Sequence, residues 1–396
     1  MKKLIVSFMA LAFCGAGAFA DAPAPTLQIS GILESGAKLV KSNNANTIGL
    51  YGDVFNDNTA VPGGHFEIDG NYVNGNNGVT FVLSNNPNAT YNGTANTVPS
   101  VASAYTPPLI YNAYAWSNLF NNMISLKAGI IGDSTITTLG DYGFGFLYSA
   151  PGVEVSATPI TGLTFLYFLS APTPTVPSLT SYLSDPWVLG AAYSNGPFAI
   201  NASLSYGAVG SDGVNASLAY TGTSLFFAAE ASLNNFNDYS NTGDTTLTQK
   251  LTYTFGSWTP GVTAYEYLYG SNIKDSLGNS ALGYKIFPFI DYAVDKVTTL
   301  ELGAIYFAGY QTASSPIYNW VGAAAANSAP ASSAFNLTEK NQAQLDVRPK
   351  ATFALDSNTT IIAYYVYSVS VGSDAAYFTG TDTNANTFVL DLRYKF

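Results

Sequence analysis

The sequence has 396 residues and a formal net charge of −11, and only 10% of its residues are charged, although it contains 28 tyrosines and 24 phenylalanines. The acidic balance excludes a nucleic-acid-binding protein, because phosphate contacts need clustered basic side chains and the only arginines are Arg348 and Arg393. The aromatic content argues against a disordered, low-complexity chain. No apolar run after residue 20 reaches the about 20 residues that a membrane-spanning helix needs.

The first twenty residues have the layout of a secretory signal peptide. Lys2 and Lys3 precede an apolar run that ends in Ala18-Phe19-Ala20, so we expect cleavage after Ala20. Cys14 leaves a lipid anchor as a less favoured alternative, because the preceding residue, Phe13, is too bulky for a lipobox. The mature chain, 21–396, would then have no cysteine and a net charge of −13, and because no linker divides it we expect one domain.

Segments in which apolar and polar residues alternate succeed one another along the mature chain. Alternation with period two gives a strand one apolar and one polar face. We expect eighteen strands, at 27–40, 64–73, 78–84, 110–117, 123–132, 152–158, 162–170, 187–194, 197–207, 214–221, 224–234, 246–256, 261–270, 281–293, 298–309, 342–355, 359–370 and 386–396. Segments 48–55 and 143–148 could be further strands. Because several strands fall short of the 9–11 residues of a tilted span, sixteen strands stays an alternative.

The connections between these strands alternate between short and long. Short ones, such as 74–77, 195–196, 222–223, 295–296 and 356–358, have tight-turn compositions, whereas 41–63, 85–109, 171–186, 310–341 and 371–385 are long. Short periplasmic turns and long external loops are typical of antiparallel up-and-down barrels in the outer membrane. Pro349 lies inside one strand, and since proline cannot donate to the ladder we expect a β-bulge there.

The last segment has the clearest alternation and ends on an aromatic residue. Its apolar face consists of Phe388, Leu390, Leu392, Tyr394 and Phe396. This segment resembles the C-terminal assembly signal of Gram-negative outer-membrane barrels of the porin class. The resemblance implies recognition by the barrel-assembly machinery, contact with outer-membrane lipid and a location in the cell outer membrane.

A barrel of this size leaves an aqueous channel, so its function depends on what narrows the lumen. The porin resemblance implies that the loop after the fifth strand, 133–151, folds inward. Asp133 and Asp141 in that loop are therefore candidates for an acidic constriction, with ordinary solvated loop residues as the alternative interpretation.

Charged residues on the polar faces of the strands are candidates for the lumenal wall. A basic cluster is expected from Lys38, Arg348, Lys350, Arg393 and Lys395, either facing the acidic loop or paired locally with Asp346 and Asp391. Further inward candidates are Glu67, Asp69, Lys127, Glu154, Glu230, Lys250, Asp291 and Glu301. Because acidic residues predominate, we expect weak cation selectivity.

Aromatic residues near strand ends suit the girdles at the two membrane interfaces. We expect these to face outward: Tyr72, Trp116, Tyr206, Tyr220, Tyr253, Tyr267, Tyr292, Tyr306, Tyr367 and Tyr394. Tyr265, Tyr267 and Tyr269 share one strand face, and a sugar-stacking track would require that face to be lumenal. Glu266 and Lys285 on the opposite parity of their strands argue that it is not.

Enzymatic and metal chemistry have little support in this sequence. The single histidine, His65, alternates with Glu67 and Asp69 on one strand, where side chains run parallel instead of converging on a nucleophile. With one histidine and no mature cysteine, we expect no cofactor and no metal site.

The sequence therefore predicts a porin, a water-filled channel for passive diffusion of small hydrophilic solutes and ions. A channel selective for sugars or peptides, and a loop-plugged barrel that acts in adhesion or structure, are the alternatives. A homotrimer is left open, because alternation does not reveal which strands form an interface between subunits.

Overall fold

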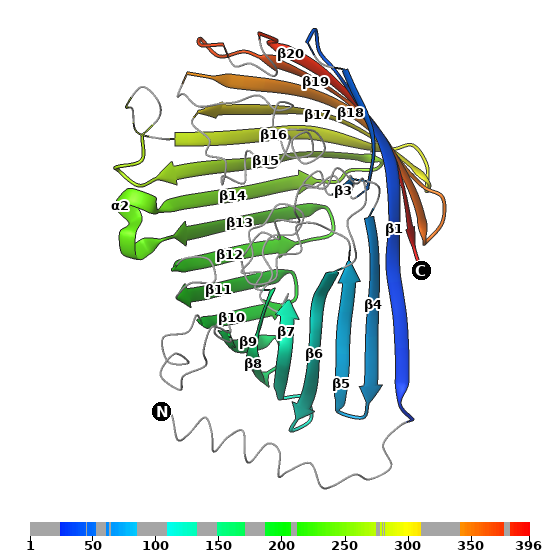
Figure 1. Ribbon diagram of the computed structural model, residues 1–396, viewed down its shortest axis with the longest axis vertical. Helices are drawn as coiled ribbons and strands as arrows, with labels where there is room; N and C mark the ends of the chain where they lie inside the picture. Colours follow the sequence, from blue (N-terminus) through cyan, green and yellow to red (C-terminus); the bar gives the residue numbers. More distant parts are fainter. Residues whose placement is uncertain are drawn as a thin grey trace.

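The computed structural model describes residues 24–44, 46–52, 61–62, 65–84, 109–132, 149–170, 187–206, 212–274, 278, 280, 282–309, 341–375 and 381–396. Nearly all of these residues lie in antiparallel strands that follow one another around a single wall (Figure 1). The strands in the first half are β1 (Thr26–Lys41), β2 (Asn46–Gly52), β3 (Val61–Pro62), β4 (His65–Asn74), β5 (Asn77–Ser84), β6 (Leu109–Leu119), β7 (Ile124–Gly132), β8 (Ser149–Ile160), β9 (Leu163–Ser170) and β10 (Trp187–Asn195). Those in the second half are β11 (Phe198–Tyr206), β12 (Gly213–Thr221), β13 (Leu225–Asn234), β14 (Asp244–Tyr253), β15 (Trp258–Tyr269), β16 (Leu282–Ala293), β17 (Thr298–Gly309), β18 (Ala343–Ala354), β19 (Thr359–Ser370) and β20 (Asn384–Lys395).

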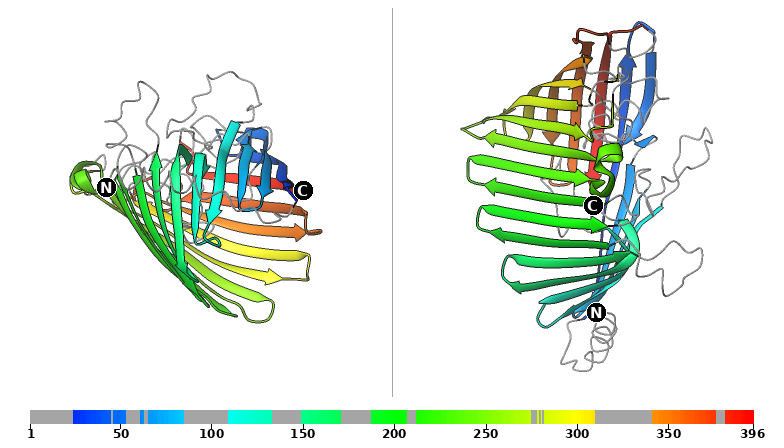
Figure 2. Two further views of the ribbon diagram at one scale, coloured as in Figure 1. Left: turned by 90° about the horizontal axis from the view of Figure 1, so that it is seen from below. Right: turned by 90° about the vertical axis from the view of Figure 1, so that its left-hand side faces the viewer.

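The wall closes into a barrel of eighteen strands, β1 and β4 to β20, within the described part of the chain. Each strand pairs with its neighbour in sequence, and β1 pairs with β4 on one edge and with β20 on the other (Figure 2). The backbones of Gly31 and Phe396 complete the seam with two hydrogen bonds, 3.0 and 3.1 Å long. Eighteen strands is thus confirmed and sixteen is wrong.

The two short strands are additions to this wall. Strand β2 pairs with Gly36–Lys41 of β1, and β3 pairs with β2, whereas β4 pairs with the first part of β1, Thr26–Glu34. The 16-residue strand β1 therefore pairs with two different strands, β4 and β2, along one edge. The optional strand expected at 48–55 is observed as β2, and the other, 143–148, lies outside the described residues.

The expected bulge at Pro349 is wrong. Strand β18 keeps one register with β19 on both sides of the proline, from Val347 paired with Tyr367 to Lys350 paired with Tyr364. Two residue pairings between those points are missing. The proline has no N–H to donate, so the ladder of hydrogen bonds is interrupted there, but no extra residue is inserted. Pro288 interrupts the β16–β17 ladder in the same way. Register shifts occur instead at Val82/Leu83 and at Ala157/Ile160.

Two of the short turns are held by aspartate side chains. Asp295 Oδ1 accepts hydrogen bonds from the backbone N–H groups of Val297 and Thr298, and Asp356 Oδ1 accepts them from Asn358 and Thr359, all at 2.6–2.8 Å. These backbone bonds favour the ionised carboxylate and lower the pKa of both aspartates below the usual value.

The hydrogen bonds in these two turns predict that part of the stability of the folded protein is lost at acidic pH. A lowered pKa gives stability that is present above the usual aspartate pKa, about 4, and is lost as the pH falls through the lowered value. We expect the Asp295→Asn, Asp356→Asn double variant to lose less melting temperature than the parent between neutral and strongly acidic pH, because asparagine accepts the same bonds without titrating. Thermal melts in detergent across that range measure this, and equal acid sensitivity in both proteins would contradict the prediction.

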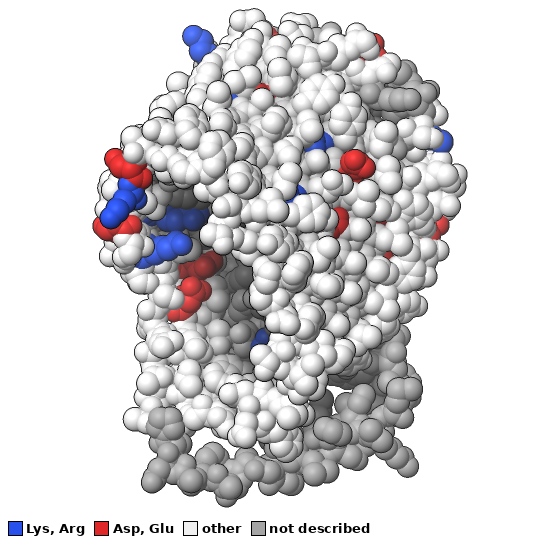
Figure 3. All heavy atoms as spheres, turned by 180° about the vertical axis from the view of Figure 1, so that it is seen from behind, with Lys and Arg blue, Asp and Glu red and all other residues white. Residues whose placement is uncertain are grey.

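The two faces of the wall differ in character. In β20, Phe388 and Leu390 are 46% and 47% exposed, whereas Val389 and Asp391 between them are 0% and 1% exposed. Apolar side chains therefore point outward and alternate residues point into the lumen, as in outer-membrane barrels. On the face seen in Figure 3, charged side chains are sparse on the outer wall and gather at a hollow. Among the described residues, no helix is long and apolar enough to cross a membrane.

Candidate functional site: the charged lumenal wall

The candidate site is the inward face of the strands from β14 through β20 to β1. Strand pairing places Lys38, Arg348, Lys350 and Arg393 on this face. Lys395 has the same parity but lies exposed at the C-terminal end of β20. The eight further inward candidates expected from parity all lie on the inward face.

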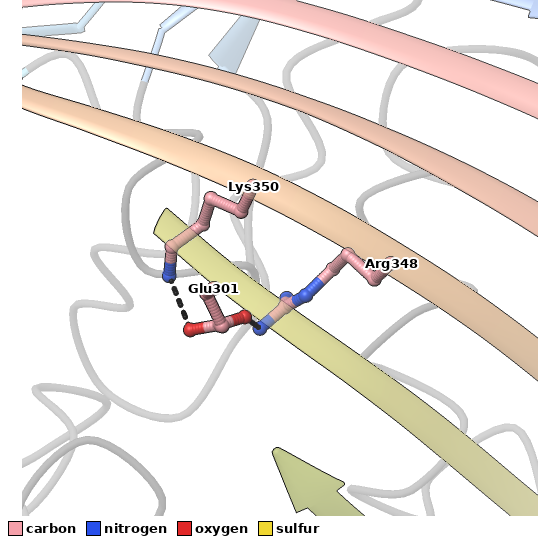
Figure 4. A network of polar contacts seen from close by, with 3 residues as sticks. All are labelled: Glu301, Arg348 and Lys350. Atoms are coloured by element: carbon pink, nitrogen blue, oxygen red, sulfur yellow. Dashed lines mark hydrogen bonds and ion pairs between the residues drawn. The ribbon is translucent and has the colours of Figure 1, made fainter. Parts of the chain in front are cut away.

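The most compact charge network lies on two neighbouring strands. Glu301 on β17 forms ion pairs with Arg348 and Lys350 on β18 (Figure 4). Arg348 Nη2 lies 2.9 Å from one carboxylate oxygen of Glu301, and Lys350 Nζ lies 3.0 Å from the other. The Arg348 and Glu301 side chains are 4% and 9% exposed, whereas Lys350 is 24% exposed. Asp291 on β16 stands next to Glu301 in register, so charges of both signs meet on one row of the wall.

A second ion pair bridges the first and last strands. Arg393 Nε on β20 donates to Glu34 Oε2 on β1 at 2.7 Å. Asp391, two residues before Arg393 on the same inward face, is also buried. On the other side of the barrel, Lys127 pairs with Glu154 at 2.9 Å.

Three of the five residues of the expected basic cluster, Arg348, Lys350 and Arg393, therefore pair with acids on the adjacent strands. Glu301 and Glu34, on the adjacent strands, form ion pairs with Arg348 and Arg393. Alternation along one strand cannot reveal these partners, because they depend on the register between strands. Because a glutamate carboxylate balances the charge of each arginine, each pair adds a dipole and no net charge to the lumenal wall.

Three tyrosines of β15 face the lumen, contrary to the expectation from sequence. Tyr265 is in register with Lys285, and the Lys285 ammonium lies 4.1 Å from the centre of the Tyr265 ring. Glu266 is the residue that faces outward, exposed and near the C-terminal end of β15. The signal that was missed is the parity of Lys285 with Asp291 on β16, because a lysine and an aspartate on one strand face mark the lumenal side.

These tyrosines belong to an inward aromatic cluster. Tyr265, Tyr267, Phe287, Ile305 and Phe307 are almost fully buried and pack together. The Arg348 guanidinium lies 4.9 Å from the centre of the Phe287 ring, so the cluster adjoins the Glu301 network.

Eight of the ten aromatic residues expected on the outer face have outward parity, and two do not. Tyr267 belongs to the lumenal cluster, and Trp116 is in register with Lys127 on the inward face. Both errors have the same reason. An aromatic ring can lie on the outer or on the lumenal face of the wall, so the face must be inferred from a charged residue that points to the same side. Elsewhere, neighbouring strands bring outward rings together, as at Trp187 and Tyr206, with ring centres 5.9 Å apart.

Several sequence-predicted features cannot be placed. Asp133 and Asp141 lie outside the described residues, and so do most of the long external loops. The backbone of His65 pairs with that of Glu34, but its side chain is likewise outside the description. Within the described part of the chain, no group of three or more His, Cys, Asp or Glu could hold a metal ion.

No protein-family model matches this chain, and no curated protein matches it. Solved structures share its fold. The outer membrane protein OprD from Pseudomonas aeruginosa is 10% identical, with a TM-score of 0.53 and coverage of 93% of each chain. Pseudomonas aeruginosa OpdO is also 10% identical, with a TM-score of 0.51 over 93% of this chain and 97% of the other. A loop L8 deletion mutant of OmpT, an outer membrane protein of Vibrio cholerae, is 16% identical, with a TM-score of 0.50 over 94% of this chain and all of the other. The chain therefore has the expected fold, that of outer-membrane β-barrels.

Proposed function

We propose that this barrel is a passive channel for small hydrophilic solutes and ions, with a weak preference for cations. The observation that supports it is a closed wall of eighteen strands whose inward face carries charged and polar side chains. In the described strands this face has a small excess of acids over bases. The acids are Glu34, Glu67, Asp69, Glu154, Glu230, Asp244, Asp291, Glu301, Asp346 and Asp391; the bases are Lys38, Lys127, Lys250, Lys285, Arg348, Lys350, Arg393 and Lys395.

Selectivity in this proposal arises from the sum of many lumenal charges. The net charge of −13 expected for residues 21–396 would raise the concentration of cations in the pore. We also propose that residues 1–20 are a removed leader, that 21–396 form one domain, and that assembly in the outer membrane uses the C-terminal signal. Assembly into a homotrimer and the absence of enzymatic activity belong to the same proposal.

The test is single-channel conductance of the purified protein in a planar bilayer under a salt gradient. We expect open steps and a reversal potential of cation-selective sign. The Asp133→Asn, Asp141→Asn double variant is expected to have a smaller cation preference, because it removes two proposed constriction carboxylates. An unchanged reversal potential would remove these aspartates from the proposal, and a silent protein would favour the loop-plugged alternative.

A substrate-selective channel is the second candidate, and the aromatic cluster on the inward face favours it. Tyr265 and Tyr269 place aromatic rings on the inward face, and Tyr269 is only partly buried at the edge of the cluster, where a ring suits the apolar face of a sugar. Concentration-dependent block of the ionic current by one sugar or peptide, absent with others of similar size, would support this candidate over general diffusion.

A further inference from the structure

One amide side chain faces outward near the middle of the barrel wall. Gln249 is the sixth of the ten residues of β14, and it is exposed between Ala229 on β13 and Ala264 on β15, with which it is in register. No hydrogen bond joins its side chain to any described residue. Within the described strands, no other amide faces outward at mid-strand. Hydrocarbon chains offer neither a donor nor an acceptor, so contact with lipid would leave this amide without a partner.

A carboxylate lies beside this amide on the same outer face. Glu266 on β15 lies two residues beyond Ala264, so it stands diagonally across from Gln249. Both side chains are exposed. An amide has two N–H donors and an acceptor oxygen, whereas a carboxylate only accepts. Gln249 is therefore complementary to the same residue of a second copy, and Glu266 can accept the N–H that such a contact leaves over.

The wall next to these two side chains is smooth. A row of four alanines in mutual register crosses the outer face of β10 to β13: Ala191, Ala202, Ala216 and Ala231. Figure 2 shows these strands in a nearly flat stretch of the wall. Short side chains let the backbones of two membrane proteins approach closely, which brings an amide on one within reach of the other.

The outward face of β10 to β15 is large enough for a stable contact between proteins. Six strands about 4.8 Å apart, crossing an apolar band about 25 Å tall, present about 700 Å² per barrel. Specific interfaces bury about 600–1,000 Å² per partner. Because the bilayer fixes the depth and the orientation of every copy, Gln249 of one copy lies at the same level as Gln249 of the next.

We infer that a second copy of this chain packs against the outward face of β10 to β15, with the Gln249 amides of the copies hydrogen-bonded to each other. The inference names the face through which the proposed homotrimer assembles, so it rests on that part of the proposed function. Lipid cannot take the place of the second copy, because its chains leave the amide without a partner. A second copy brings a matching amide to the required depth.

Disulfide cross-linking in native outer membranes tests this contact. Residues 21–396 contain no cysteine, so Gln249→Cys introduces a single thiol there. We expect mild oxidation to give a cross-linked dimer that the parent does not form. Ala128→Cys is the matched control, because Ala128 is exposed on the outer face of β7, seven strands away, and both residues lie four positions from the turn end of their strand. Its yield measures random collision. A Gln249→Cys yield no greater than this, or a cross-link to a different protein, would overturn the inference.

Gln249→Leu tests the hydrogen bond without a thiol. Leucine suits a lipid-facing position, so the barrel should refold like the parent. Association measured by sedimentation in detergent should weaken about tenfold, or about 1.4 kcal/mol, the size of an amide contact between membrane segments. Association as strong as that of the parent would overturn the role of the amide.

Conductance and sedimentation separate this inference from the proposed function. A parent that sediments as a trimer but gives no specific Gln249→Cys cross-link would retain the homotrimer and overturn this face. A conducting monomer would refute the interface and retain the channel. A protein that cross-links through Gln249→Cys, while the parent stays silent in a planar bilayer, would refute the channel and retain the interface.

Discussion

Deletion of Phe396 is expected to reduce the yield of folded barrel more than any single substitution on the outer wall. Its backbone makes the two hydrogen bonds to Gly31 that complete the seam, and its ring lies over that glycine, where a Cβ atom would be 2.5 Å from Cζ. Two lost hydrogen bonds, at about 1 kcal/mol each, correspond to about a thirtyfold change in the folding equilibrium. The measurement is the heat-modifiable fraction after refolding in detergent.

Refolding in detergent separates two roles of this residue. The assembly signal predicted from Phe388, Leu390, Leu392, Tyr394 and Phe396 acts through cellular machinery, which a refolding mixture lacks. A loss that persists in detergent therefore belongs to the seam itself, and a loss confined to cells belongs to the signal. Phe396→Tyr, which keeps both the ring and the backbone, is the control and should refold like the parent. Normal refolding of the deletion variant would contradict the role of the seam.

Replacing Glu301 by alanine is expected to destabilise the barrel by about 3–5 kcal/mol, the usual cost of leaving one member of a buried ion pair without its partner. Arg348, whose side chain is 4% exposed, would keep its charge in a site where water has little access. Lys350→Ala removes the other cation from the same carboxylate, but Lys350 is 24% exposed and the expected cost is at most about 1 kcal/mol.

The comparison of these two variants is the informative measurement. Urea unfolding of each protein in lipid or detergent gives the free energy of unfolding, and the double-mutant cycle of Glu301 with Arg348 isolates their coupling. Asp346 lies on the same strand as Arg348 and could take the place of the missing partner. Equal losses in the free energy of unfolding for Glu301→Ala and Lys350→Ala would mean that Asp346 replaces Glu301, and that the burial of Arg348 does not determine the cost of losing its partner.

The strands could be predicted closely from sequence because the membrane demands strict alternation. The expected ranges 298–309 and 359–370 coincide with β17 and β19 at both ends. Alternation fails to give the partners of each charge, because Glu301 meets Arg348 through the stagger between strands. It also misassigned Tyr265, since Glu266 stands near a strand end, where a charge facing lipid costs little.

Closure of the barrel joins the two most distant parts of the chain. The Glu34–Arg393 contact spans 359 positions of sequence. All other pairs of adjacent strands in the barrel wall consist of strands that follow each other along the chain. Contacts of such long range form slowly, because the ordering of a long intervening loop must precede them. Until that moment β1 and β20 have open edges that can pair with other chains, so the period before closure is when this protein is most exposed to aggregation.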